Sequence, residues 1–310
     1  MAPLKSLERE YPMLDSDFQS FCASHGISTV EDFLMQDLYV FAALVEQQQN
    51  SERLKEGITQ VLSIIDGQHQ PWKNGIELLE DADKNKGLLP TGVEGIDTIL
   101  QGGLRRGQLT ELVGPSTSGK TQVCLQIASN VAKNQTGSVV YIDTCNSFSP
   151  QHIKQFVIQN SFSASDEVRS KTVQKVMSNI FCHSVFNIFA MFDVLRHLEN
   201  NLRSQMQIVN SMVLLVIIDS LSSLVTPILG GGGAHGRALM TSAGSMLKKL
   251  AHEQNIAIMV VNHMVGGEGG NPKPALGETW KSIPHVRLLL STDRETNVSN
   301  VFVIKHPSIT

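Results

Sequence analysis

A strand-like run, a loop with two glycines and a helix-like run follow one another directly in LTELVGPSTSGKTQVCLQIASNVA, residues 109–132. LTELV is typical of a buried strand, and the apolar residues after Lys120 recur at helical spacing. Gly114 and Gly119 allow the backbone to wrap closely, so that successive N–H groups point at one anion. The positive end of the following helix faces the same anion. The pattern predicts a phosphate-binding loop between a strand and a helix.

The loop residues predict a nucleoside triphosphate with Mg2+ as the ligand. Lys120 would place a compact charge near the β- and γ-phosphates, and the Thr121 hydroxyl would ligate the metal. The alternative is a chance match on an ordinary turn, which is expected roughly 0.01 times in a chain of this length. We expect Lys120 to lie in an exposed loop. The expected nucleotide-binding residues are Gly114, Pro115, Ser116, Thr117, Ser118, Gly119, Lys120 and Thr121.

Asp219 ends the apolar run MVLLVIID and is the second expected magnesium ligand, beside Thr121. A carboxylate at the end of a buried strand is the usual partner of the magnesium ion in sites of this kind. The alternative is a strand-ending aspartate that caps the next turn. The phosphate-binding loop upstream favours the magnesium role.

Short apolar runs alternate with helical patterns from about residue 91 onward. Several runs are hydrophobic at consecutive positions, as expected for strands that are buried on both faces. The expected strands are 109–113, 138–144, 179–185, 212–219, 256–263 and 285–292. The helical stretches that separate them include 121–132, 188–202 and 239–253. This alternation predicts an α/β fold with a mostly parallel sheet.

The first part of the chain has a different pattern. Residues 12–65 indicate short helices, one of which has Ser28 or Thr29 as its cap. The polar, turn-rich stretch that follows indicates a linker, and WKNGIELLED inside it has enough apolar content to dock against a partner. We therefore expect a small all-helical N-terminal domain over 1–65, a linker over 66–90 and an α/β core over 91–310.

Charge and cysteine content exclude several classes of protein. The formal net charge is −4, so the chain is not a basic nucleic-acid coat and any DNA contact must be local. The start of the chain lacks the apolar core of a secretory signal, and MVLLVII is too short to span a bilayer. The cysteines lie far apart, which argues against a zinc site or a disulfide framework and favours a reducing compartment; they are Cys22, Cys124, Cys145 and Cys182.

From residue 13 onward the chain resembles the eukaryotic RecA-like recombinases. The resemblance is carried by GISTVEDFL, LPTGVEGIDTILQGGLRRGQLTELVG, the phosphate-binding loop, VVYIDT, FNIFAMFDVLRHL, VVNHMV and KPALGETW. The pairing of FNIFAMFDVL with KPALGETW is similar to the delta branch of the paralogues rather than to the recombinase itself. The resemblance implies a helical N-terminal domain and a RecA-like P-loop ATPase core that binds ATP and Mg2+. It further implies nuclear work in homologous recombination and DNA double-strand break repair, in a complex of several paralogue subunits.

Three positions depart from the pattern that this resemblance implies. The family has a glutamate after YIDT that orients the attacking water, and Cys145 stands there. A thiol is a weak acceptor, and the loss of a water-orienting base costs on the order of 100-fold or more in rate. His263 stands where an amide senses the γ-phosphate; it can still donate a hydrogen bond, or it is a satisfied strand-end histidine. His152 occupies the place of an arginine that stacks on adenine, and an imidazole can stack too.

The resemblance also implies two DNA-contacting loops, after the strands that end at Asp219 and Asn262. Here they are TPILGGGGAHGR and MVGGEGGNPKPALGETW, both rich in glycine and expected to be mobile. With few cations in them, affinity for DNA should be modest and salt-sensitive. The alternative is a pair of surface loops with Trp280 packed inward. The expected contacts with single-stranded or branched DNA are Arg237, Lys273, Trp280 and Lys281.

These observations favour a regulatory, ATP-binding paralogue with slow hydrolysis at most, whose linker and helical domain contact partner subunits. The first alternative is an active DNA-dependent ATPase that forms its own filament and exchanges strands; the missing glutamate argues against it. The second is a P-loop kinase or other NTPase with a small-molecule substrate; the lead-in before the loop and the lack of an evident arginine-rich lid argue against it.

The last residues, NVFVIKHPSIT, are typical of one strand of a hairpin. Members of the resembled family continue with a returning strand. We expect either a shortened form of the chain or a bare sheet edge, which would invite pairing with another strand.

Overall fold

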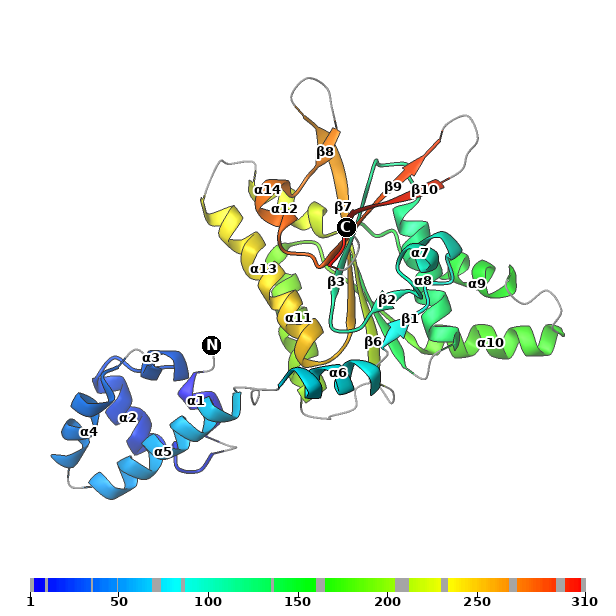
Figure 1. Cartoon of the computed structure of the whole chain (residues 1–310). Coiled ribbons are helices and arrows are strands. Elements are labelled where there is room, and N and C mark those ends of the chain that lie inside the picture. Colours follow the sequence, from blue (N-terminus) through cyan, green and yellow to red (C-terminus); the bar gives the residue numbers. More distant parts are fainter. Residues whose placement is uncertain are drawn as a thin grey trace. The chain divides into compact units, whose positions relative to one another are not determined.

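The computed structural model describes residues 3–8, 11–34, 36–48, 50–68, 74–84, 87–134, 137–159, 165–203, 212–229, 234–267, 272–293 and 299–307. The chain forms two compact units, Met1–Asn85 and Lys86–Thr310. Figure 1 shows that the first unit is built from helices and the second from a sheet flanked by helices.

The first five helices of the first unit pack around a core that contains aromatic side chains. The buried side chains at the centre of this core include Phe18, Phe33 and Phe41. The last helix of the unit lies within the stretch expected to be a linker. The helices are α1 (Leu4–Leu7), α2 (Ser16–Ser24), α3 (Val30–Leu34), α4 (Leu38–Glu46), α5 (Ser51–Gln68) and α6 (Gly75–Lys84).

The helix cap predicted at Ser28 or Thr29 is present at the start of α3. Thr29 Oγ1 accepts from the backbone N–H of Asp32 at 3.1 Å. In return the Asp32 carboxylate accepts from the N–H groups of Ser28 and Thr29, at 3.0 and 2.9 Å. This reciprocal arrangement satisfies donors that the helix itself leaves unpaired. Hydrogen bonds from Ser28 and Thr29, first that from the Ser28 backbone, lower the pKa of Asp32.

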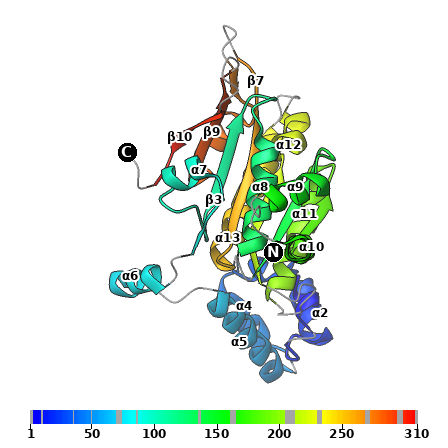
Figure 2. The ribbon, with the colours of Figure 1, turned by 90° about the vertical axis from the view of Figure 1, so that its right-hand side faces the viewer.

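The second unit is built on one sheet with the strand order β10-β9-β3-β7-β6-β4-β5. All neighbours in this path are parallel except β9 and β10. Figure 2 shows β10 and β9 beside β3. The predicted α/β fold with a mostly parallel sheet is therefore confirmed. The strands are β3 (Leu109–Gly114), β4 (Ser138–Asp143), β5 (Ile180–Ser184), β6 (Val213–Asp219), β7 (Ala257–Gly266), β9 (Val286–Thr292) and β10 (Ser299–Lys305).

Two short pairings lie off this path. β1 (Leu88–Leu89) pairs with β2 (Leu104–Arg105) in the lead-in to the phosphate-binding loop. β8 (Pro272–Pro274) pairs with residues 264–266 of β7. This second pairing explains why β7 continues to Gly266, past the end of the strand predicted at 263.

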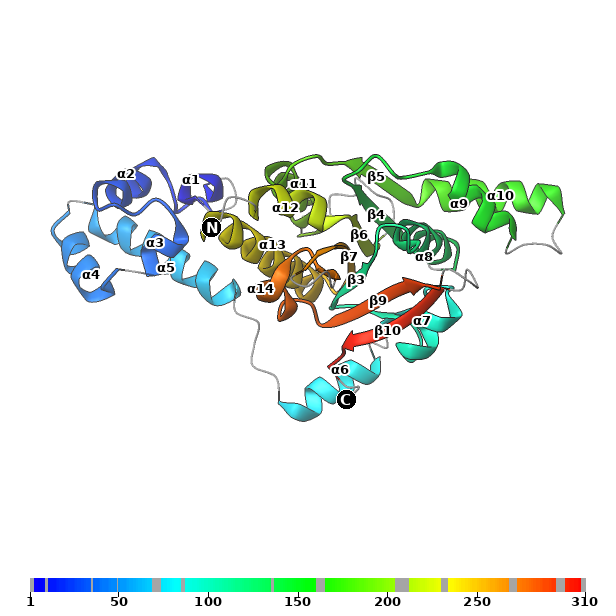
Figure 3. The same cartoon turned by 90° about the horizontal axis from the view of Figure 1, so that it is seen from above.

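Helices cover both faces of the sheet, as Figures 1 and 3 show. One buried cluster lies under α8, and the other contains residues of α11, α12 and α13. Among the helices of the described ranges, none is both long and apolar enough to cross a membrane. The helices of this unit are α7 (Glu94–Ile99), α8 (Lys120–Asn134), α9 (Pro150–Gln159), α10 (Asp166–Ser178), α11 (Ile188–Arg203), α12 (Leu221–Leu229), α13 (Ala234–Glu253) and α14 (Gly277–Lys281).

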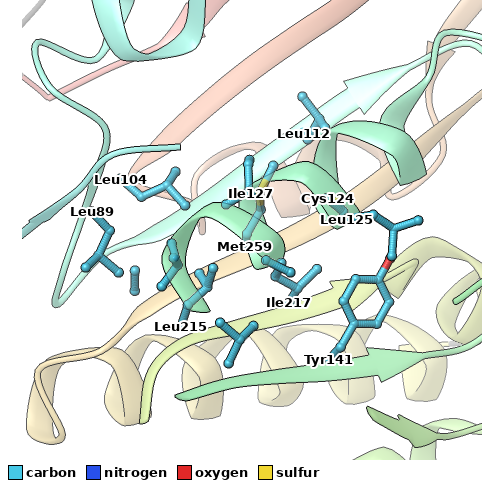
Figure 4. Packing of buried hydrophobic residues seen from close by; sticks show 14 of the residues in the cluster. Leu89, Leu104, Leu112, Cys124, Leu125, Ile127, Tyr141, Leu215, Ile217 and Met259 are labelled. Carbon is cyan, nitrogen blue, oxygen red and sulfur yellow. The ribbon is translucent and has the colours of Figure 1, made fainter. Parts of the chain in front are cut away.

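The helix that follows the phosphate-binding loop is anchored by its apolar side. Figure 4 shows Leu125 and Ile127 of α8 in one cluster with Ile217 of β6 and Met259 of β7. All of these side chains are fully buried. Burying apolar side chains of this size stabilises the fold by about 1.5–3 kcal/mol each. Helix α8 is thereby held against the central strands β6 and β7.

Glu111, in the middle of β3, is a fully buried carboxylate that ties four elements together. Its Oε1 accepts from Asn262 Nδ2 of β7 at 2.7 Å and from Trp280 Nε1 of α14 at 2.9 Å. Its Oε2 accepts from Arg287 Nε of β9, which is 3% exposed. A buried charge that keeps its partners is tolerated, whereas one that loses its partner is strongly destabilising.

We expect Glu111→Ala to lower the free energy of unfolding by about 3–5 kcal/mol, because it leaves the Arg287 guanidinium buried without its carboxylate. The measurement is urea unfolding followed by Trp280 fluorescence, in a Trp72→Phe background. Glu278→Ala is the control, since Glu278 pairs with Lys281 at the surface and should matter little. Equal stability of the two variants would contradict the role given to Glu111.

Candidate nucleotide-binding site

The carboxyl ends of the central strands meet at one edge of the sheet. Gly114, the last residue of β3, is in register with His263 of β7. Asp143, the last residue of β4, is in register with Asp219, the last residue of β6. Because β6 and β7 are neighbours, with Ile218 opposite Val260, these four positions lie at one edge of the sheet, with His263 further along its strand than Asp219. We call these positions the row of strand ends. This edge is where open parallel sheets bind their ligands.

The loop that follows β3 is held in a closely wrapped form. A Cβ atom at Gly114 would lie 2.5 Å from both the Leu290 carbonyl oxygen and Ser118 Oγ. Gly119 has a φ of +83°, which side chains on other residues disfavour. Ser118 Oγ donates to the Pro115 carbonyl at 2.9 Å, and α8 begins one residue after Gly119. The wrapped form of the loop thus requires glycine at both positions.

Lys120 is buried, and the expectation that it lies in an exposed loop is wrong. It is the first residue of α8 and is 4% exposed. Its Nζ donates to the carbonyls of Gly114 and Pro115, at 2.8 and 2.5 Å. Burial lowers the pKa of Lys120, and the nearby carboxylate of Asp219 opposes this shift. The ammonium group of Lys120 therefore lies against the backbone of the phosphate-binding loop.

Asp219 is 3% exposed and accepts from the Tyr141 hydroxyl at 2.9 Å. Its charge acts on Lys120 and on His263, so the carboxylate lies in the same small region as both. Thr121 follows Lys120 in the first turn of α8 and is half-buried. A carboxylate and a hydroxyl are hard oxygen ligands, which fit Mg2+.

Metal ligands are otherwise sparse. No group of three or more His, Cys, Asp or Glu side chains gathers in the part of the chain that the structure describes. Magnesium in nucleotide sites is commonly held by one or two protein ligands together with phosphate oxygens and water. Thr121 and Asp219 match that requirement.

His263 has a fixed position at the end of the buried part of β7. Its Nε2 lies 2.7 Å from Ser220 Oγ, and its backbone N–H donates to Ser222 Oγ at 3.0 Å. Burial, and then the charge of Lys120, lower the pKa of His263. The His263 ring is thus hydrogen-bonded within the fold and also lies near Lys120. These surroundings are compatible both with a contact to the γ-phosphate and with a satisfied strand-end histidine.

Cys145 is exposed and lies in a tightly held turn. The Asp143 carboxylate accepts from the backbone N–H groups of Cys145, Ser147 and Phe148. These bonds fix the backbone at the end of β4 and place the thiol at the same edge as Asp219 and His263. The residue expected to replace the water-orienting glutamate therefore lies in the row of strand ends.

His152 lies on α9 beside the start of α8. Its Nδ1 is 3.4 Å from Nε2 of Gln122, the second residue after Lys120. Its backbone N–H donates to Ser149 Oγ at 3.3 Å, at the beginning of α9. The expected adenine contact is therefore close to the phosphate-binding loop, although a contact with the base remains a prediction.

Comparison with known proteins connects this geometry to one family. A family model described as Rad51 matches residues 85–297. The chain belongs to the Rad51 family. The bovine protein "DNA repair protein RAD51 homolog 4" is 32% identical over 287 residues, which cover 92% of this chain and 84% of the bovine one. The expected resemblance to recombinase paralogues of the delta branch is thereby confirmed.

Other relatives of this Rad51-family chain have similar names. The mouse "DNA repair protein RAD51 homolog 4" is 34% identical over 218 residues, covering 70% of this chain and 64% of the mouse one. The archaeal "DNA repair and recombination protein RadB" of Archaeoglobus fulgidus is 27% identical over 222 residues, covering 71% and 89%. These names associate the Rad51-family relatives with DNA repair and recombination.

The side chains expected to contact DNA in this Rad51-family chain are divided between surface and core. Arg237 in the first turn of α13, Lys273 on β8 and Lys281 on α14 are exposed. Trp280 is fully buried and donates to Glu111, so the expected stacking of a base on its ring is wrong and the inward alternative holds. Residues 230–233 and 268–271 of the two expected loops lie outside the described residues.

Sequence reasoning missed two groups of residues, one in the middle of β3 and one at this edge. Glu111 stands out as a charge within the apolar run LTELV, but nothing local shows that Arg287 is its partner. The second group is the hydroxyl cluster formed by Thr144, Ser220 and Ser223, whose oxygens contact one another. The serine-rich stretch DSLSS was the available signal.

We expect Gly114→Ala to destabilise the second unit by about 1–3 kcal/mol, because its Cβ would press on the Leu290 backbone. Thermal unfolding measured by calorimetry provides the check. Gly95→Ala is the matched control: it lies in helix α7 with open space around it and should be neutral or slightly stabilising. A Gly114 variant as stable as the Gly95 variant would contradict the close wrapping of the loop.

Proposed function

We propose that this chain is an ATP-binding recombinase paralogue that acts in homologous recombination and DNA double-strand break repair as a subunit of a multi-paralogue complex in the nucleus. Its intrinsic ATP hydrolysis is slow or absent. The proposal is supported by one observation above all: the row of strand ends brings the phosphate-binding loop, Lys120 and Asp219 together, while the position after YIDT carries Cys145.

The residues that would hold MgATP are those of the loop and its neighbours. The wrapped backbone from Gly114 to Gly119 would surround the phosphates, and Lys120 would neutralise their charge. The Thr121 hydroxyl and the Asp219 carboxylate would hold Mg2+, which neutralises the phosphate oxygens when bound. His263 would donate to the γ-phosphate, and His152 would lie on the adenine side.

Slow hydrolysis follows from the chemistry of Cys145. A thiol accepts hydrogen bonds weakly and therefore orients and activates water poorly. The absence of a carboxylate there would cost on the order of 100-fold or more in rate. The bound nucleotide would then order a subunit interface rather than drive turnover.

Partner contacts are assigned to the first unit and to the segment 66–90. α6 lies in that segment and exposes Ile76 and Leu79, which are 72% and 64% exposed. Exposed apolar side chains at helical spacing are typical of interaction surfaces. The partners proposed are other recombinase paralogue subunits, together with single-stranded or branched DNA.

Lys120→Ala should weaken MgATP binding at least about tenfold, because it removes a charged donor to the phosphates. Equilibrium binding of a fluorescent ATP analogue to the full chain measures this effect. Lys133→Ala, at the far end of the same helix, is the control and should bind normally. Equal affinities of the wild type and Lys120→Ala would place the nucleotide elsewhere.

The same purified proteins test whether intrinsic ATP hydrolysis is slow or absent. The wild-type chain should bind MgATP and turn it over very slowly, even with DNA, and Cys145→Glu should raise turnover at least in part. Fast turnover by the wild type that Lys120→Ala abolishes would support the alternative, an active DNA-dependent ATPase that forms its own filament.

Arg237→Ala combined with Lys273→Ala should weaken single-stranded DNA binding and reduce the slope of log K against log salt by roughly 1.4, because two phosphate contacts are lost. Titrations at several salt concentrations measure this slope. Lys154→Ala with Lys171→Ala removes the same charge from the exposed surface of α9 and α10 and is the control. An unchanged slope in the first variant would assign DNA contact to another surface or to a partner.

A further inference from the structure

Hydroxyl groups form a chain that joins His263 to Cys145 across the row of strand ends. His263 Nε2 lies 2.7 Å from Ser220 Oγ, and Ser220 Oγ donates to Ser223 Oγ at 3.1 Å. Ser223 Oγ lies 2.6 Å from Thr144 Oγ1, which lies 3.5 Å from Cys145 Sγ. The chain therefore runs from β7 through the start of α12 to the end of β4. It connects two of the three positions at which this sequence departs from the pattern that the resemblance implies.

The oxygen atoms of this chain are held in place by the backbone. Thr144 Oγ1 accepts from the Ser220 N–H at 2.7 Å, and the Thr144 N–H donates to the Asp219 carbonyl at 3.0 Å. Ser223 Oγ also donates to the Ser220 carbonyl at 2.7 Å. Ser220 is 0% exposed and Thr144 is 7% exposed. The oxygens are thus fixed, whereas the hydroxyl hydrogens can rotate between acceptors.

The Ser220 hydroxyl has a single hydrogen, and the direction in which it points determines which nitrogen of a neutral His263 ring carries a hydrogen. Ser220 donates to Ser223, so a neutral His263 ring in this arrangement carries its hydrogen on Nε2 and donates it to Ser220. If a bound γ-phosphate oxygen accepted from the other ring nitrogen, the neutral ring would carry its hydrogen on Nδ1. Nε2 would then be an acceptor, and Ser220 would turn its hydrogen from Ser223 to His263.

This exchange leaves the charge of the site unchanged. The hydrogen that leaves Nε2 passes to water and another returns to Nδ1, so the ring stays neutral and no net proton is taken up. Burial and Lys120, which lower the pKa of His263, favour that neutral ring. Ser223 loses a donor in the exchange. The Thr144 hydroxyl, which donates to the Ser220 carbonyl at 3.0 Å and lies 2.6 Å from Ser223 Oγ, can turn its hydrogen to Ser223 instead, and this alters the hydroxyl beside Cys145.

We propose that Ser220, Ser223 and Thr144 transmit the contact between His263 and a γ-phosphate to Cys145, so that a triphosphate and a diphosphate produce different environments at the thiol. The inference rests on the proposed nucleotide site. Ser223 acts in this chain as a positioning residue. It is not one of the residues assigned to bind the phosphates or the metal. The site would thereby report which nucleotide is bound without hydrolysing it.

The test uses the full chain with Cys182→Ser, so that Cys145 is the exposed cysteine among the described residues. Cys22 and Cys124 are buried, and burial raises the pKa of Cys22 to about 12 and that of Cys124 well above its usual value, which makes both unreactive. The rate at which a small maleimide modifies Cys145 is measured by mass spectrometry with saturating MgADP and with MgATPγS. Affinities for both nucleotides are measured in parallel for every variant.

The two rates should differ by at least about twofold in the parent chain, as expected for one altered hydrogen bond. Ser223→Ala should bring their ratio to unity without changing either affinity, and Ser223→Thr, which keeps the hydroxyl, should restore it. Ser147→Ala is the matched control, because Ser147 lies two residues from Cys145 but bonds to Asp143, off the chain. It should leave the ratio unchanged.

The outcomes separate the inference from the proposed function. A parent chain that binds MgATPγS but shows equal rates would overturn the inference alone. A ratio that persists in Ser223→Ala would also overturn it, because direct shielding of Cys145 by the nucleotide would then explain the difference. Failure of the parent to bind MgATPγS would overturn the nucleotide site, and the inference with it.

Discussion

The buried carboxylate of Glu111 fixes the part of the sheet on which the remaining features depend. Burying an ion costs several kcal/mol, and here the cost is offset by Arg287, Asn262 and Trp280 around it. A slip of β3 by one residue would turn this carboxylate to the other face of the sheet and separate it from all three. The register of β3 against β7 and β9 is therefore strongly specified.

The candidate site follows from that register rather than from any single motif. Because Gly114 faces His263, the loop after β3 begins beside the end of β7. Because Asp143 faces Asp219, the turn that carries Cys145 begins beside the carboxylate that acts on Lys120. The functional side chains are residues that follow strands, so their positions depend on where the strands end.

The sequence predicted the features that local chemistry determines. Strands buried on both faces are visible as apolar runs, and the glycines of GPSTSGKT are required by a loop whose form is local. Long-range partners were not predictable in this way. Trp280 is turned inward because the distant Glu111 accepts its N–H. Lys120 is a different case, because its ammonium group donates to the nearby carbonyls of Gly114 and Pro115 and is buried by the loop itself. The start of α13 at Ala234, before the predicted 239, depends on packing: a Cβ at Gly236 would clash with the Ile228 backbone of α12.

The pairing of β3 has a consequence for biosynthesis. β3 has β7 and β9 as its neighbours, so Leu109 pairs with Ile258 and Thr110 with Val286. β4, by contrast, pairs with β5 and β6, which follow it sooner in the chain. As the chain leaves the ribosome, the β4–β5–β6 part of the sheet can form first, while the strand that leads into the phosphate-binding loop waits for partners that have not yet been made. A nascent chain would thus expose the apolar residues of β3 until β7 has been made, and chaperones would have a long opportunity to act on this strand.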